Sequence, residues 1–167
     1  RVAGHGCNLV EVTGGEPLLH PDIEAILECV RDQGIELTVE TNGVLCTQDL
    51  AAAIARCKSP FVSVSLDGAD ALTHEWVRGV AGSFDRAVEA VHSLVAAGVR
   101  PQLIMCLMRK NRDQMEPFVR LAETLGAESV KFNLLQPTAR GSALTQDGEA
   151  LGIEELARLG RWAETEL

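Results

Sequence analysis

Short apolar runs rich in β-branched residues alternate with amphipathic segments along the chain, and this alternation limits the possible folds more than any other feature. Near-continuous apolar runs are typical of buried parallel strands, and the amphipathic segments have the period of helices. Strands that alternate with helices form parallel βαβ crossovers, so the sequence predicts an α/β fold that is either barrel-like or doubly wound. The expected strands are residues 7–13, 35–41, 61–67, 102–108 and 129–135.

Capping residues and glycines mark where the expected helices begin and end. Thr47 and Ser83 can act as N-caps, and Gly34, Gly98 and Gly126 each follow a helical pattern, as glycines at helix ends do. No GxGxxG turn follows the first strand, which weakens a dinucleotide-binding interpretation. The expected helices are residues 21–33, 47–58, 84–97, about 112–125 and 153 to about 166, with a loop over 141–152 before the last.

Composition narrows the class of protein. The 167 residues suffice for one domain, and 24 acidic against 15 basic residues give a formal net charge of -9. No run rich in Lys or Arg is present, which disfavours nucleic-acid binding. No apolar run approaches the roughly 20 residues that span a bilayer, and the first ten residues lack the layout of a signal peptide. We therefore expect a cytoplasmic protein without nucleic-acid or membrane partners.

The cysteines do not form a recognisable metal or disulfide motif. Their number is odd, their spacing is irregular, and neither CxxC nor CxxxCxxC occurs, so reduced thiols are expected and no metal ligand is assigned. The five cysteines are Cys7, Cys29, Cys46, Cys57 and Cys106.

Polar or glycine-containing segments follow all five expected strands. Turn chemistry alone favours Gly, Asn, Asp and Pro at any one of these places. In α/β barrels, however, the active site is assembled at the carboxyl ends of the strands, so five such ends together indicate a site there. These segments are residues 13–17, 40–43, 65–68, 109–111 and 135–137.

The first of these segments has the chemistry of an ammonium site. Gly14 and Gly15 let the backbone approach a ligand closely, and Glu16 adds a negative charge beside them. Pro17 removes a donor and fixes the backbone. Glu40, one residue before Thr41-Asn42-Gly43, could point into a barrel mouth or toward the helices.

Four motifs together resemble those of radical S-adenosylmethionine (SAM) enzymes over essentially the whole chain: TGGEPLLHPD, ETNG, VSLDG and RGVAGSFD. The resemblance implies a partial (β/α)6 barrel with parallel strands, lacking the first β/α unit, over residues 1–167. It also implies two cofactors, SAM and a [4Fe-4S] cluster. The CxxxCxxC cluster loop should lie upstream of Arg1, and any carboxyl-terminal SPASM region is absent. The fragment alone is expected to be inactive.

The same resemblance assigns SAM contacts. In the family the GGEP segment holds the amino group of the SAM methionine, which implies that role for Gly14, Gly15 and Glu16, with Pro17 beside them.

Further contacts are implied on the neighbouring strand ends. Ser65 would contact the SAM carboxylate or ribose, with Thr41 and Asn42 lining the same mouth. Arg78, expected in a loop over 76–79, would clamp the carboxylate or else be a solvated surface residue. Asp67 would form a turn or meet hydroxyl groups of substrate or SAM.

Two later segments, GSFD and LQPTARG, resemble the SPASM-containing branch. This implies hydrogen-atom abstraction from a peptide or cofactor precursor, with an electron donor such as ferredoxin or flavodoxin. The alternative is a catalytically inactive radical SAM-like scaffold or peptide-binding module, and a CxxxCxxC motif encoded upstream would argue against it. A hydrolase or aldolase on an ordinary barrel would need a catalytic Lys, a metal triad or a nucleophile elbow, and the sequence shows none.

Overall fold

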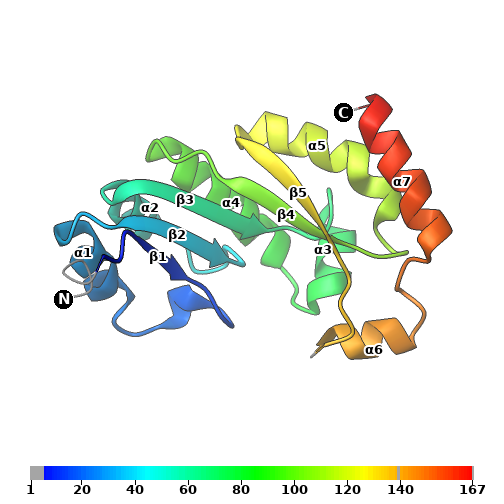
Figure 1. Cartoon of the computed structure of the whole chain (residues 1–167), viewed down its shortest axis with the longest axis horizontal. Coiled ribbons are helices and arrows are strands. Elements are labelled where there is room, and N and C mark those ends of the chain that lie inside the picture. Colours follow the sequence, from blue (N-terminus) through cyan, green and yellow to red (C-terminus); the bar gives the residue numbers. More distant parts are fainter. Residues whose placement is uncertain (1–5, 139, 167) are drawn as a thin grey trace.

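The computed structural model describes residues 6–138 and 140–166, and within them five strands form one parallel sheet (Figure 1). The strands lie side by side in chain order, and every neighbouring pair is parallel. The predicted α/β class and the parallel sheet are therefore confirmed. The strands are β1 (Leu9–Val12), β2 (Glu36–Thr41), β3 (Lys58–Ser65), β4 (Gln102–Leu107) and β5 (Ser129–Leu134).

The five expected helices are present. Thr47 caps its helix as predicted, because its side chain accepts a hydrogen bond from the Leu50 N–H at 3.2 Å. The helices are α1 (Ile23–Asp32), α2 (Gln48–Ala55), α4 (Ser83–Ala96), α5 (Met115–Leu125) and α7 (Ile153–Glu166). Short 3₁₀ turns, η2 (Pro17–Leu19) and η3 (Arg112–Gln114), lie after β1 and before α5.

Three local predictions were wrong. The segment 76–79 belongs largely to helix α3 (Ala71–Arg78), whose N-cap Asp70 accepts from the Thr73 N–H at 2.8 Å. Part of the expected loop over 141–152 is helix α6 (Arg140–Gln146). The N-cap of α4 is Gly82 and not Ser83, which is the first residue of the helix. The Ser83 hydroxyl does not cap the helix but donates to the Val80 carbonyl at 2.7 Å. Helices of two turns show little apolar periodicity, so sequence patterns detect them poorly.

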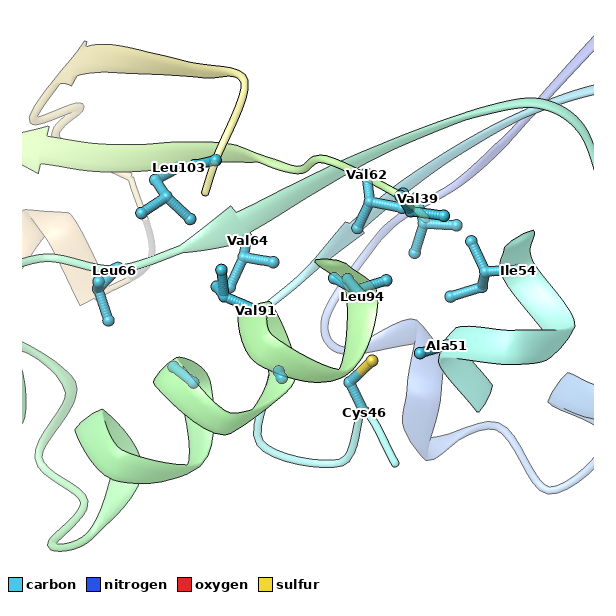
Figure 2. Close-up of a cluster of buried hydrophobic side chains, with 14 of the residues drawn as sticks. Val39, Cys46, Ala51, Ile54, Val62, Val64, Leu66, Val91, Leu94 and Leu103 are labelled. Atoms are coloured by element: carbon cyan, nitrogen blue, oxygen red, sulfur yellow. The ribbon is translucent and has the colours of Figure 1, made fainter. Parts of the chain in front are cut away.

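One face of the sheet is covered by helices and holds the core. Side chains alternate between the faces of a strand, and the covered face carries buried apolar residues such as Leu37 and Met105. Helices α1, α2, α4 and α5 lie on this side (Figure 1). Figure 2 shows strand side chains and helix side chains packed together in this core. Those labelled include Val39, Val62, Val64 and Leu103 from the strands and Ala51, Ile54, Val91 and Leu94 from the helices.

The other face, called the open face below, is mostly polar. It consists of the alternate residues of the same strands, and the register between strands places them in rows. None of the described helices is long and apolar enough to cross a membrane. The open face comprises Leu9, Glu11, Glu36, Thr38, Glu40, Lys58, Phe61, Ser63, Ser65, Gln102, Ile104, Cys106, Ser129, Lys131 and Asn133.

Candidate functional site

The GGEP, TNG and SLDG segments meet at one edge of the sheet. Thr41 pairs with Val64, and Ser65 pairs with Ile104, so the ends of neighbouring strands are nearly level. Because all strands are parallel, the segments that follow them emerge on the same edge, where α3 and α6 also lie (Figure 1). The shared position that the sequence predicts is confirmed.

Glu16 joins two of these segments. Its Oε1 accepts a hydrogen bond from the Thr41 hydroxyl at 2.6 Å and another from the Leu18 N–H at 3.1 Å. Its Oε2 accepts from the Asn42 N–H at 2.7 Å. An ionised carboxylate has about four acceptor positions, so three are occupied within the protein. Glu16 therefore fixes the GGEP turn against the TNG turn, and one acceptor position is left for a nearby cation.

Gly14 and Gly15 differ in what the backbone demands of them. Gly14 has a φ of 126°, which side chains other than glycine rarely adopt, whereas Gly15 has an ordinary φ. A Cβ on Gly15 would meet no atom within 4 Å. Packing inside the protein thus does not explain Gly15, and its lack of a side chain leaves room for a ligand. Pro17 is buried at the start of η2.

The TNG segment divides into a buried and an accessible part. Thr41 is only 3% exposed, and its hydroxyl also accepts from the Gly43 N–H at 3.0 Å, so Thr41 acts inside the protein. The side-chain oxygen of Asn42 accepts from the Val44 N–H at 2.8 Å. Its amide N–H₂ therefore remains as a donor toward a ligand.

Ser65 ends β3 on the open face. It is half-buried, and its hydroxyl has no hydrogen-bond partner among the described residues. Glu40, whose direction the sequence left undecided, also lies on the open face and accepts from the Thr13 hydroxyl at 3.2 Å.

Asp67 is the centre of a buried network. It is 3% exposed, its Oδ2 pairs with Arg78 Nε at 2.8 Å, and its Oδ1 accepts from the Cys106 N–H at 2.8 Å. Its own N–H donates to His74 Nδ1 at 3.0 Å, and its carbonyl accepts from Asn111 Nδ2 at 2.9 Å. Asp67 thus connects β3, β4 and α3. The ion pair orients Arg78, whose side chain is 21% exposed and is not a solvated surface arginine.

A hollow of about 190 Å³ lies between the TNG segment, α3 and the start of α4. Arg78 and Arg86 supply positive charge, and the N-terminus of α4 adds to it. The site residues that sequence reasoning missed are Arg86 and His74. In the sequence, the only signal for these two residues is that they lie near the RG and GSFD segments. Nearness in sequence does not say which way a side chain points. The hollow is lined by Asn42, Val44, His74, Arg78, Val80, Ser83 and Arg86.

His74 is neutral in this setting. Its pKa is lowered to about 4, mainly by burial and next by the Arg78 charge, while the charges of Asp67 and Glu75 act in the opposite direction. A neutral ring with Nδ1 as acceptor then carries its proton on Nε2. The neutral form is therefore the one that keeps the bond from the Asp67 N–H.

We expect protein stability to depend on this protonation. The folded-state pKa of His74 lies below the ordinary 6.5, so its contribution is complete above pH 6.5 and is lost as pH falls toward 4. The loss should reach up to about 3 kcal/mol. Urea unfolding between pH 7 and 4 should show a steeper decline for the wild type than for His74→Asn. His92→Asn, on the exposed side of α4, is the control; equal slopes in the wild type and His74→Asn would contradict the assignment.

The described residues offer no obvious metal site. Among them, no group of three or more His, Cys, Asp or Glu side chains could hold a metal ion. Burial raises the pKa of the Cys46 and Cys106 thiols to about 11, so both stay protonated at neutral pH. An iron–sulfur cluster does not fit the described residues.

Comparison with known proteins gives consistent matches. A family model described as "Radical SAM superfamily" matches residues 1–122. An "AdoMet-dependent heme synthase" from Methanosarcina barkeri (strain Fusaro / DSM 804) is 33% identical over 141 residues, covering 84% of this chain and 40% of that protein. The "Mycofactocin maturase MftC" of Mycobacterium tuberculosis (strain CDC 1551 / Oshkosh) is 34% identical over 139 residues, covering 83% and 35%.

A solved structure shares the fold. Streptococcus suis SuiB bound to precursor peptide SuiA matches with a TM-score of 0.76 and 18% identity, over 93% of this chain and 34% of that one. This likeness shows the fold alone and supports the partial barrel that the sequence predicts. The chain spans less than half the length of each of these proteins.

Proposed function

Because the chain belongs to the radical SAM superfamily, we propose that this protein binds SAM at the carboxyl edge of its sheet, cleaves it reductively and abstracts a hydrogen atom from a peptide or cofactor precursor. Residues 1–167 form its core domain. The names of the similar proteins support this substrate class, since one is a heme synthase, one a mycofactocin maturase, and SuiB is described with a precursor peptide. Reduction requires an electron donor such as ferredoxin or flavodoxin.

The observation that carries the proposal is the opposite polarity of adjoining parts of the site. Glu16 provides negative charge, while Arg78 and Arg86 provide positive charge around the hollow. Asn42 belongs to both parts, because its backbone N–H donates to Glu16 and the residue is among those that line the hollow. The methionine end of SAM carries an ammonium and a carboxylate on one carbon, which suits this arrangement.

In this proposal, residues of both parts of the site contact the methionine end of SAM. The Gly14 and Gly15 carbonyls and Glu16 would accept from the ammonium, and Arg78 with the Asn42 amide would hold the carboxylate. The Ser65 hydroxyl would donate to the carboxylate or the ribose. When bound, SAM supplies the radical that abstracts hydrogen. This chain's contribution is to orient the SAM molecule, and the Asp67–Arg78 ion pair fixes the cation that does so.

The test is SAM turnover and affinity in a protein that carries this chain together with a CxxxCxxC loop and its [4Fe-4S] cluster, called the cluster-loaded protein below. With dithionite as reductant, we expect mass spectrometry to detect 5'-deoxyadenosine from SAM. Ser65→Ala should weaken SAM binding by about tenfold or more, because a hydrogen bond to a charged group contributes roughly 1.5 to 3 kcal/mol. Ser63→Ala, two residues earlier on the same face, should bind SAM normally. Absence of 5'-deoxyadenosine from a protein with a full cluster would refute the proposal.

A further inference from the structure

The open face carries charges of opposite sign on its two sides. Glu11 on β1 and Glu40 on β2 are exposed at one end of the strand order. Lys131 on β5 is exposed at the other end, on the same face. Lys58 on the same face is paired with Glu36, whereas Lys131 has no ionic partner among the described residues. A substrate that lies across this face would meet different charges at its two ends.

Register places Lys131 in the same row as Ser65. Ser65 pairs with Ile104, and Ile104 pairs with Lys131, so the three residues follow one another across β3, β4 and β5. Neighbouring strands lie about 4.8 Å apart, which puts the Cα atoms of Ser65 and Lys131 roughly 10 Å from each other. A substrate group bound by Lys131 would therefore lie only a few residues' length away from a ligand bound at Ser65.

Lys131 is not committed to another partner in the described part of the chain. No ion pair or hydrogen bond of its side chain is found there, whereas Lys58 on β3 pairs with Glu36 at 3.5 Å. Asn133, two residues later on the same strand and face, is also exposed and can donate an amide N–H. Ile104 contributes apolar surface between Lys131 and Ser65. A cation, an amide donor and an apolar neighbour are what a carboxylate on an aliphatic stem requires.

We propose that Lys131, assisted by Asn133, binds a carboxylate of the substrate, and that the substrate is a peptide whose acidic side chain lies over β5. The inference rests on the proposed function, since the SAM edge defines where the reacting part of the peptide must lie. It adds to the proposed function a chemical class of substrate, namely a peptide with an acidic side chain. Lys131 is thus a specificity-determining residue.

The experiment measures peptide retention. Two libraries of random heptapeptide amides, one with Asp and Glu and one with Asn and Gln in their place, are mixed and passed over immobilised cluster-loaded protein with SAM. We expect acidic peptides to be retained about fivefold more than neutral ones, as an exposed ion pair of about 1 kcal/mol allows. Lys131→Met should abolish the preference, Lys131→Glu should shift it to peptides with Lys or Arg, and Lys58→Met should leave it intact.

Equal retention of both libraries, or a preference that survives Lys131→Met, would overturn the inference. Lys131 would then serve only to discourage pairing at an edge strand. Formation of 5'-deoxyadenosine by the wild type is scored separately with dithionite. Its failure would remove the proposed function, while its success with no acidic preference would remove only the inference.

Discussion

Asp67→Ala should lower the free energy of unfolding by about 3 to 5 kcal/mol, the usual cost of removing one partner from a buried ion pair. The change leaves the Arg78 guanidinium without its 2.8 Å partner and the Cys106 N–H without its acceptor. Both groups lie between β3, β4 and α3, so the loss also loosens the edge that carries Ser65. Urea unfolding, with an m-value close to that of the wild type, measures this effect.

Two variants make the Asp67 prediction specific. Asp67→Asn retains an oxygen for the Cys106 N–H but loses the charge that orients Arg78, so we expect a smaller loss of stability and a clear loss of SAM affinity. Asp32→Ala breaks an exposed ion pair with Arg31, where the Asp32 side chain is 66% exposed, and should cost less than about 1 kcal/mol. If Asp67→Ala proved as mild as Asp32→Ala, the buried network would not hold this edge together.

Glu16→Ala should impair both stability and SAM binding. It leaves the buried Thr41 hydroxyl and the Asn42 N–H without their acceptor, and such orphaned groups cost about 1 to 3 kcal/mol each. We therefore expect about 3 kcal/mol lower stability, a thermal midpoint lower by roughly 6 to 12 °C, and SAM affinity reduced by at least about tenfold. Calorimetry of the cluster-loaded protein measures both.

The neighbouring carboxylate is the matched control for Glu16. Glu40 is exposed, and its one hydrogen bond among the described residues comes from the Thr13 hydroxyl at 3.2 Å, so Glu40→Gln should change the thermal midpoint little. A Glu16→Ala protein with normal stability but weak SAM binding would show that the carboxylate acts on the ligand alone. Normal SAM affinity with reduced stability would show that Glu16 only holds the two turns together.

Much of the fold followed from local patterns. Each strand and each long helix carries its own signal of apolar period, cap or terminal glycine, and parallel strands necessarily place the GGEP, TNG and SLDG segments on one edge. The short helices α3 and α6 could not be predicted from the sequence, because two turns contain too few residues to define an apolar period. Ser83 was misassigned because a Ser beside a Gly leaves two candidates for one cap.

Local sequence patterns could not predict on which face of the sheet a strand side chain lies. Glu40 could face either way until pairing of β2 with β1 and β3 assigned it to the open face. A one-residue change of register would have reversed that answer. The position of Lys131 beside Ile104 likewise depends on strand order, which no local sequence pattern specifies.

What the amino-acid sequence determined by itself is the alternation of strands and helices, the family, and the edge where the chemistry must lie, because these depend on signals within short segments. Only the tertiary structure decided what the polar side chains at that edge do. Glu16 meets Thr41 25 positions along the chain, and Asp67 meets the Cys106 N–H 39 positions along. Such contacts depend on strand register and on the paths of loops and of α3, which bring Arg78 and Arg86 to one hollow. Those paths result from packing against the whole sheet.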